Sequence, residues 1–466
     1  MKLSQFDATG LAALFSQGTA TPTEALEQVE QDIARLDPKL GCYSARNPMA
    51  KAEAAAATER WRNGVTRGPL DGVPIILKDN LVAAGMPAAW GNRTLASRRC
   101  HVDEGPVGRL RAAGLVVLGK GNTPEFAVEG YTDNLTFGPT RNPFDARLTP
   151  GGSSGGVVAA VASGLAWAGL GTDGGGSIRR PAGYCGLVGL KPGKGRVPRS
   201  GGLAQVLLDF EDVGPIARSM RDVASLDSIL SGHPVRSGAG GPLRVLLVPR
   251  MGDAPCDPEI LTALKAAADA LVDLGHDVTE AAFPLNLTEL NRAWPRIAEI
   301  GLARYFADEP DVAATAAPKY QEMAARGASA PATELYRILD QIAELRAAAP
   351  HLFATCDVIM TPTAAAMPWN ATESYPRQIN GLAVGPRGSA VYTGWVNAAG
   401  LPALAIPAPS DGLPIGVQLV GPMDSEARLM TLGASLERRF GGFRWPDLTG
   451  ADAPLALSSA SQCVGS

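Results

Sequence analysis

Three short segments carry lysine and serine side chains in settings that could support nucleophilic chemistry without histidine. GVPIILKDN has Lys78 directly after the apolar run 73–77, PGGSSGG has Ser153 and Ser154 between glycines, and GTDGGGSIRRPA has Ser177 after three glycines. A lysine acts as a general base only when neutral, so its pKa must fall from about 10.4 to about 7–8. Burial in apolar surroundings produces such a fall. A serine between the lysine and a second serine could then pass a proton along.

Two glycine motifs in the chain resemble nucleotide-binding loops but fail in context. GLVVLGK, residues 114–120, has the spacing of a phosphate-binding loop, but Gly121 stands where a Ser or Thr must hold magnesium. GLGTDG, residues 169–174, fits a dinucleotide fingerprint, but more glycine follows it and no acidic residue lies about 20 positions on. We therefore expect no nucleotide cofactor.

GGSSG, residues 151–155, fits the GxSxG elbow of an α/β-hydrolase with Ser153 as nucleophile. That mechanism needs a histidine later in the chain, and the candidates are His233, His276 and His351. The strand that should precede the elbow is missing, because RNPFDARLTP is a proline-interrupted loop. An esterase of this class stays open as an alternative, less favoured than chemistry based on Lys78.

Taken together, the lysine and serine segments resemble the amidase signature family, in which a lysine, a serine in a cis peptide and a second serine 24 residues later form the catalytic triad. The resemblance implies that Ser177 is the nucleophile, Ser153 the proton relay and Lys78 the base. It implies an oxyanion hole built by Gly174, Gly175 and Gly176, and supporting roles for Ser154, Asp173 and Arg179.

The resemblance runs almost continuously over residues 68–200 and resumes at DVIMTPT and at VYTGWVNAAGLPALAIPAPSDGLPIGVQLVGP. It implies hydrolysis of the C–N bond of a small carboxylic amide through an acyl-enzyme, without metal or organic cofactor. Carbamate, urea-type and ester bonds stay open as substrates of the same machinery. Family members are often dimers, so a homodimer also stays open.

The choice of substrate is less well determined by the sequence. Aromatic residues expected near the pocket favour an apolar or aryl group, and they are Trp90, Phe126, Tyr131, Phe137, Trp369 and Trp395. Relatives that form the A subunit of glutamyl-tRNA amidotransferase commonly carry an acidic residue just before the VYT segment, where this chain has Ala390. A glutaminase subunit is therefore the second hypothesis, although Arg387 could still bind an acidic group.

The elements that must position these residues alternate between short apolar strands and helices. VPIIL, LVVLG and WAGLGT read as strands, and residues 21–36 read as a helix with Thr21 as cap and Glu24 completing a capping box. This alternation predicts an α/β sheet covered on both faces. The resemblance implies one α/β/α domain over residues 1–466 with a large, mixed, twisted sheet. The N-terminal helices of residues 1–65 would pack outside it, and residues 285–350 would form a mostly helical lobe.

Composition excludes several other classes of protein. The chain has 466 residues and a formal net charge of −4, and it lacks a lysine- and arginine-rich stripe, so no nucleic-acid partner is expected. No apolar run approaches the about 18 residues of a membrane span, and the N-terminus lacks a signal-peptide pattern. Six widely spaced cysteines without a CxxC pair or a Cys/His cluster predict reduced thiols and no metal site. We expect a cytoplasmic protein.

Overall fold

The computed structural model describes residues 1–234 and 241–448, which build one eleven-stranded sheet and a separate two-stranded one. The strand order of the large sheet is β1-β3-β2-β4-β6-β5-β12-β13-β9-β7-β8. Its strands are β1 (Tyr43–Arg46), β2 (Pro74–Lys78), β3 (Val116–Gly121), β4 (Ala168–Asp173), β5 (Val188–Lys191), β6 (Asp212–Ala217), β7 (Arg244–Leu247), β8 (Asp277–Glu280), β9 (Val358–Pro362), β12 (Ala403–Ala408) and β13 (Ile415–Val420). The pair β10 (Gln378–Ile379) and β11 (Leu382–Ala383) stands apart.

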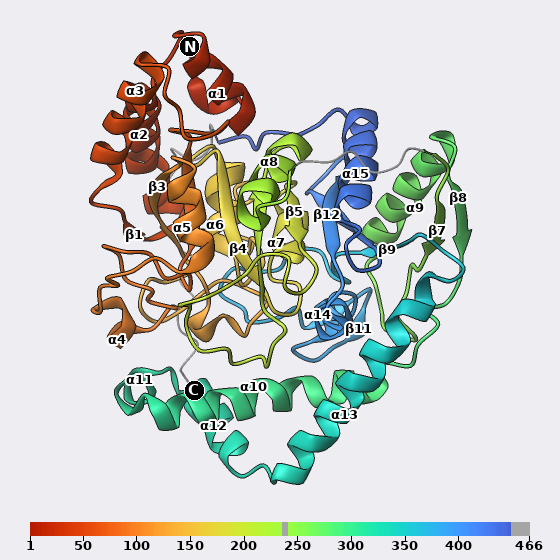
Figure 1. The fold of residues 1–466 in the computed structure, drawn as a ribbon. Coiled ribbons are helices and arrows are strands. Elements are labelled where there is room, and N and C mark those ends of the chain that lie inside the picture. The colour runs from red at the N-terminus through yellow and green to blue at the C-terminus, as the bar shows by residue number, and fades with distance from the viewer. Residues whose placement is uncertain (235–240, 449–466) are drawn as a thin grey trace, which may run out of the picture.

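The large sheet is mixed, because β2 runs parallel to β3 and β4 whereas β4 and β6 are antiparallel. Helices cover both of its faces (Figure 1). The prediction of an α/β fold with a mixed sheet between helices is confirmed. The helices are α1 (Ala8–Ser16), α2 (Pro22–Leu40), α3 (Ala50–Arg62), α4 (Arg93–Ala96), α5 (Gly105–Ala112), α6 (Gly155–Ala162), α7 (Arg179–Tyr184), α8 (Met220–Ser231), α9 (Pro258–Asp273), α10 (Thr288–Asp308), α11 (Pro310–Thr315), α12 (Pro318–Ala328), α13 (Ala332–Ala348), α14 (Gly394–Ala399) and α15 (Glu426–Phe440).

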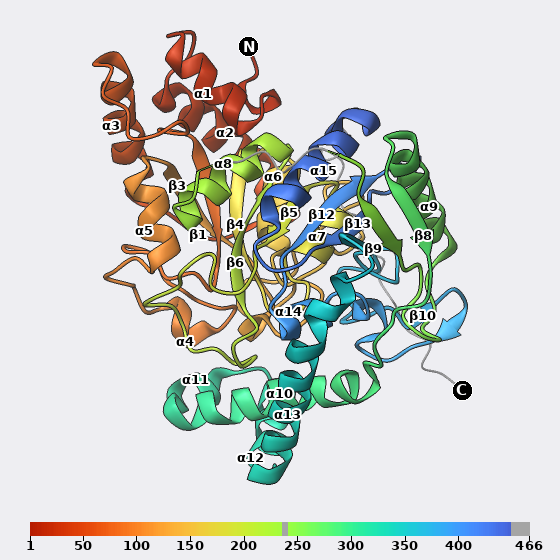
Figure 2. The same cartoon turned by 45° about the vertical axis from the view of Figure 1, so that its right-hand side comes forward.

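Helix α2 begins as the sequence predicts and ends later. The Thr21 side chain accepts the Glu24 backbone N–H, and the Glu24 carboxylate accepts the Thr21 N–H at 2.8 Å, which completes the capping box. The helix continues past Leu36, through a proline, to Leu40. Leu40 is buried, and Gly41 closes the helix in the left-handed conformation, so packing outweighs the loss of one hydrogen bond. Helices α2 and α3 pack together beside one end of the sheet (Figure 2).

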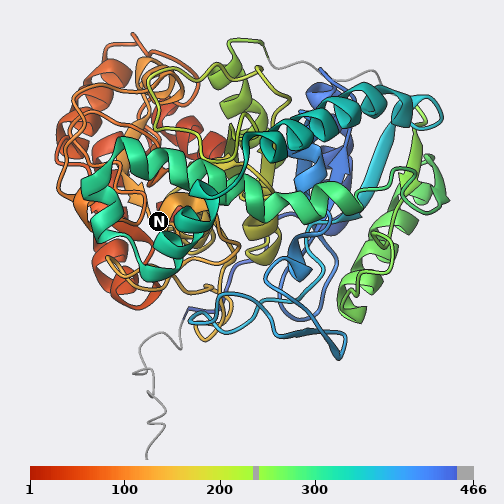
Figure 3. The same ribbon diagram turned by 90° about the horizontal axis from the view of Figure 1, so that it is seen from below.

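Residues 285–350, expected to be mostly helical, contain α10, α11, α12 and α13. These helices lie below one end of the sheet in the view of Figure 1. In the view from below, the green and teal helices α10 and α13 therefore lie in front of the sheet (Figure 3). Helix α10 packs against α12 and α13. The loops after β2 and β4 lie at this end of the molecule, and Trp294 of α10 packs against Gly175 in the loop after β4.

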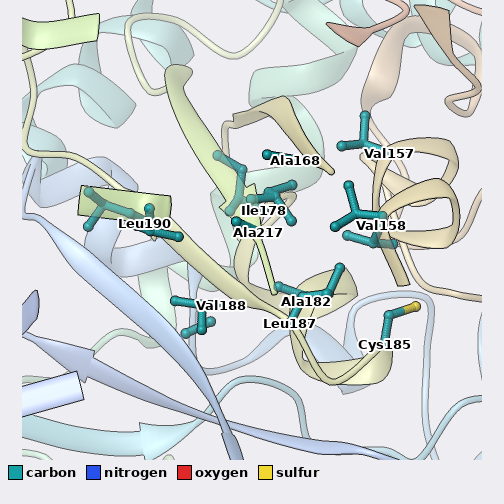
Figure 4. Close-up of a cluster of buried hydrophobic side chains, with 14 of the residues drawn as sticks. Val157, Val158, Ala168, Ile178, Ala182, Cys185, Leu187, Val188, Leu190 and Ala217 are labelled. Carbon is teal, nitrogen blue, oxygen red and sulfur yellow. The ribbon is translucent and has the colours of Figure 1, made fainter. Parts of the chain in front are cut away.

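The core beneath the site is made by α6 and α7 packing on the central strands. Figure 4 shows small and branched side chains in close contact between these helices and β4, β5 and β6, among them Val157, Val158, Ala168, Ile178, Ala182, Cys185, Leu187, Val188, Leu190 and Ala217. Every one of these residues is at most 1% exposed. A dry, close-packed base of this kind fixes the loops that leave it.

Two further expectations can be compared with the described residues. Their five cysteines form no disulfide, whereas Cys463 lies outside the described residues. Within residues 1–234 and 241–448, no helix combines the length and the apolar character needed to cross a bilayer.

Candidate active site

Lys78 is the last residue of β2, and its side chain is fully buried. Its Nζ lies 2.7 Å from Ser153 Oγ, 3.0 Å from the Thr172 carbonyl oxygen and 2.8 Å from Thr172 Oγ1. Because β2 and β4 are parallel neighbours, their C-terminal ends, which carry Lys78 and Thr172, lie at the same edge of the sheet. The sheet itself therefore brings the amine to its partners.

Ser153 and Ser154 form the turn that leads into α6. The Gly152–Ser153 peptide bond is cis, and Ser154 is the residue before the first residue of the helix. The Ser154 N–H donates to the Ser177 carbonyl at 3.3 Å, which joins this turn to the second serine segment. Ser153 is fully buried, whereas Ser177 is 6% exposed, so Ser177 is the more accessible of the two.

The turn that carries Ser177 is held by a buried ion pair between Asp173 and Arg179. The Asp173 carboxylate accepts the Gly176 N–H at 2.6 Å and the Ile178 N–H at 3.0 Å, and Arg179 Nη2 lies 2.9 Å from its Oδ1. Burial acts to raise the pKa of Asp173, but the Arg179 charge and these hydrogen bonds outweigh it and hold the pKa well below its usual range. Asp173 and Arg179 thus tie the backbone on both sides of Ser177 together, and the supporting role expected for them stays a prediction.

The charge state of Lys78 is set mainly by its surroundings. Burial lowers the pKa of Lys78 to about 7, while the negative charges of Glu211 and Asp173 act against this shift. The Glu211 carboxylate accepts the Thr172 hydroxyl at 3.1 Å and is paired with Arg199. Near neutral pH a large fraction of Lys78 is therefore the free amine, which is the form that can accept a proton.

The glycine segment 174–176 directly precedes Ser177, and neighbouring side chains fix its backbone. Gly176 has φ +115, a conformation that glycine adopts without strain, and its N–H is engaged by Asp173. The Gly175 carbonyl accepts the Thr393 hydroxyl at 2.7 Å, which fixes that peptide. A Cβ on Gly175 would lie 2.8 Å from Trp294 Cζ2, so α10 packs directly on this turn.

The aromatic residues expected at the pocket lie in separate clusters. Trp90 and Phe126 pack edge-on to each other and to Tyr305 of α10. Tyr131 and Trp369 share a small cluster with Tyr184, Trp395 packs on Phe283, and Phe137 is half-buried. Their assignment to substrate binding stays a prediction.

Several residues that shape the site escaped the sequence analysis. They are Thr172 and Glu211 beside Lys78, Thr393 and Asn397 beside the glycine turn, Gln418 beside Arg179, and Trp294 on α10. Thr172 stands just before Asp173 in a segment already singled out, so its place at the end of a strand was a usable signal. The others reach the site only through strand pairing and helix packing between distant segments.

Histidine takes no part in this arrangement. His276 Nδ1 accepts the Leu243 N–H at 3.1 Å at the far edge of the sheet, and His101, His233 and His351 are exposed. The side chain hydrogen-bonded to Ser153 Oγ is Lys78 and not a histidine, which removes the support for an esterase built on Ser153 and histidine. In the part of the chain that the structure describes, no group of three or more His, Cys, Asp or Glu side chains is arranged to hold a metal ion.

Comparisons with known proteins agree with this geometry. The Amidase family profile matches residues 24–430. The A subunit of glutamyl-tRNA(Gln) amidotransferase from Anaeromyxobacter sp. (strain K) is 34% identical, covering 89% of this chain and 93% of its own. A bacterial aryl acylamidase of the amidase signature enzymes has a TM-score of 0.85 at 28% identity, covering 93% of this chain and 96% of its own. 6-Aminohexanoate cyclic dimer hydrolase, solved with substrate, has a TM-score of 0.86 at 29% identity, covering 96% of this chain and 100% of its own.

Proposed function

The chain belongs to the amidase signature family of hydrolases, and from this premise we propose that it hydrolyses small carboxylic amides through an acyl-enzyme on Ser177. In this proposal Ser177 is the nucleophile, Ser153 relays the proton and Lys78 is the base. Asp173 and Arg179 position the nucleophile turn. The substrate is a small molecule.

The observation that carries the proposal is the set of three contacts around Lys78 Nζ. The Thr172 carbonyl oxygen can only accept a hydrogen bond, and the Thr172 hydroxyl gives its own proton to Glu211 and so accepts from Lys78. A neutral amine has two N–H groups and one lone pair. With both N–H groups committed to Thr172, the lone pair faces Ser153 Oγ at 2.7 Å, as a base toward Ser153 requires.

In the acylation step, Ser177 Oγ bonds to the carbonyl carbon while its proton passes to Ser153 and the Ser153 proton passes to Lys78. Collapse of the tetrahedral intermediate breaks the C–N bond, and the proton returns by the same route to the leaving nitrogen. Water then attacks the ester carbonyl with Lys78 again as base, which releases the carboxylic acid and restores the Ser177 hydroxyl.

The negative charge on the carbonyl oxygen needs backbone donors. The Gly176 N–H is committed to Asp173 at 2.6 Å, so we assign the oxyanion to the neighbouring amides of Gly174, Gly175 and Ser177. The hydrogen bond from the Gly176 N–H to Asp173 instead fixes the turn that directs these amides. Carbamate, urea-type and ester carbonyls would fit the same donors.

A second candidate function is that of a glutaminase within a larger assembly. The 34% identity to a protein named as the A subunit of an amidotransferase favours it. The alanine at position 390, where such relatives commonly carry an acid, argues against it. Hydrolysis of free glutamine, measured for the isolated chain and for the chain with any copurifying partners, separates the two functions.

The test is turnover of a panel of aliphatic amides, anilides, carbamates and glutamine by single variants. We expect Ser177→Ala and Lys78→Ala to abolish turnover and His233→Ala, His276→Ala and His351→Ala to keep it. Ser329→Ala, on an exposed helix end, controls for the loss of a serine hydroxyl. An active Ser177→Ala enzyme would disprove the proposal.

A further inference from the structure

Two consecutive arginines follow the nucleophile, and they have opposite surroundings. Arg179 is bonded to Asp173, Thr393, Asn397 and Gln418. Arg180 is only 7% exposed, yet its buried Nε has no hydrogen-bond partner. Within residues 1–234 and 241–448, no carboxylate lies within ion-pair distance of the Arg180 guanidinium. A buried charge without a counter-ion is costly, so it demands an explanation.

A second guanidinium in the same region is also without a counter-ion. Arg387 Cζ lies 4.6 Å from the centre of the Trp294 ring, and no carboxylate among the described residues forms an ion pair with it. Burial and the nearby Arg180 charge both lower the pKa of Arg387, to about 9, so it is still charged at neutral pH. A Cβ on Gly394 would lie 3.4 Å from Arg387 Nη2, and Gly394 follows Thr393, whose hydroxyl donates to the Gly175 carbonyl, so this second guanidinium also lies beside the segment that carries Ser177.

Both arginines border the turn that carries Ser177. A Cβ on Gly176 would lie 2.8 Å from Arg180 Nε, and one on Gly175 would lie 2.8 Å from Trp294, the ring that Arg387 covers. Arg387 and Trp294 line a cavity of about 630 Å³ together with Leu207, Ala390 and Val391. This cavity has the size of a small-molecule site, and its Trp294 ring packs on Gly175 in the turn that carries Ser177.

Two carboxylates, Glu129 and Glu299, line this cavity, and both are already paired. Glu129 attracts both arginines at longer range, but its carboxylate is paired with Lys319 at 3.2 Å. Glu299 is paired with Arg296 and Arg326, so neither carboxylate forms an ion pair with Arg180 or Arg387. Arginine presents a planar fork of donors that matches a carboxylate.

From this arrangement we infer that the amide substrate also carries a carboxylate, which Arg180 and Arg387 bind beside the scissile carbonyl. The inference rests on the proposed amide hydrolysis and names the class of substrate. It adds that the substrate lacks an ammonium group next to the carboxylate, because Ala390 offers no counter-charge and the two carboxylates of the cavity, Glu129 and Glu299, are paired with other side chains. Monoamides of short dicarboxylic acids fit this description.

Matched substrates test the inference in the full-length wild-type enzyme. Glutaramate carries the carboxylate, glutaramide is its neutral counterpart, and glutamine adds an ammonium group to glutaramate. Succinamate and succinamide form a shorter pair. We expect kcat/KM for one of the two amide acids to exceed that for its diamide by about 10- to 100-fold, the usual size of a charge-assisted contact, and to exceed that for glutamine.

Variants then assign the preference to the two arginines. Arg180→Gln and Arg387→Gln should each reduce kcat/KM for the amide acid about 10- to 100-fold more than for the diamide. Arg304→Gln removes an exposed charge from α10 and should leave the preference unchanged. Binding of the product dicarboxylate to Ser177→Ala, followed by calorimetry, should weaken when either arginine is replaced. Should Arg180→Gln fail to fold, Arg387→Gln gives the same test, because Arg387 is only half-buried.

The outcomes separate this inference from the proposed function. An enzyme that hydrolyses diamides and amide acids equally well would overturn the carboxylate site while leaving amide hydrolysis in place. A preference for glutamine over glutaramate would overturn the absence of the ammonium group. A wild-type enzyme inactive on every amide in the panel would overturn the proposed function itself.

Discussion

Lys78 Nζ and Ser153 Oγ lie 2.7 Å apart, and neither side chain is exposed to solvent. The amine comes from the end of a central strand and the hydroxyl from the turn before a buried helix. Nothing in the contact depends on a flexible surface segment. In the proposed mechanism, the protonation of this one amine decides whether Ser153 can accept a proton from Ser177.

The first prediction concerns pH. Burial lowers the pKa of Lys78 to about 7, so the amine is charged below this pH and neutral above it. Because the neutral form is the base, kcat/KM should rise about tenfold per pH unit below pH 7 and level off above it. Initial rates between pH 5 and pH 9 measure this directly, and a level profile would contradict it.

Lys120 provides a control for that profile. It is as buried as Lys78, but its amine donates to the Leu81 carbonyl and not to a serine. Lys120→Gln should therefore leave the midpoint of the profile in place, even if it destabilises the fold. A midpoint that moved in this variant would contradict the assignment of the pH dependence to Lys78.

The second prediction concerns Glu211, whose negative charge acts to raise the pKa of Lys78. Glu211 is ionised, because the charges of Arg199 and Lys78 outweigh the effect of its burial and lower its pKa. Glu211→Gln removes the negative charge, so the pKa of Lys78 should fall and the rising limb of kcat/KM should move to lower pH. The exposed Glu322→Gln is the control, and a limb displaced to higher pH would refute the assignment.

Local features of this chain were readable from its sequence. The capping box at Thr21 and Glu24, the strand before Lys78 and the α/β sheet covered on both faces all depend on neighbouring residues or on alternating patterns, whereas the mixed strand directions were implied by the family resemblance. The end of α2 was misjudged because burial of Leu40 outweighs the proline inside the helix. The catalytic assignment came from a family resemblance, since the spacing of Lys78 and Ser153 does not by itself bring them together.

The remaining parts of the site depend on contacts between distant segments. Glu211 reaches Thr172 because β4 and β6 are antiparallel neighbours, a pairing that the sequence does not specify. Residue type alone also does not distinguish Arg179 from its neighbour Arg180, and it was the family resemblance that implied a supporting role for Arg179. Only the packing of α7 gives one of them an ion pair and leaves the other without a partner.

The third prediction separates the two serines. Ser177→Ala should form no acyl-enzyme, whereas Ser153→Ala keeps the nucleophile and loses the proton relay, so its kcat should fall by about 10²–10⁴-fold. Intact-protein mass spectrometry after mixing with an activated amide measures the adduct. Ser163→Ala, a buried serine at the other end of α6, should behave as wild type. An adduct on Ser153 in the Ser177→Ala enzyme would reverse the two roles.

The fourth prediction concerns the ion pair that holds the nucleophile turn. Asp173 and Arg179 are both fully buried and 2.9 Å apart, so Asp173→Asn leaves the guanidinium without a counter-ion. Removing one partner of a buried pair costs about 3–5 kcal/mol, which urea unfolding should register as a lower free energy of unfolding. Asp145→Asn breaks a pair whose arginine is largely exposed and should have a much smaller effect. The two oxygens of Asp173 accept the Gly176 and Ile178 N–H groups, and an asparagine has only one oxygen to replace them. One of the two bonds is therefore lost in Asp173→Asn, so activity should fall even where the protein stays folded. Equal losses of stability in the two variants would mean that Asp173 is not a structural centre of the turn.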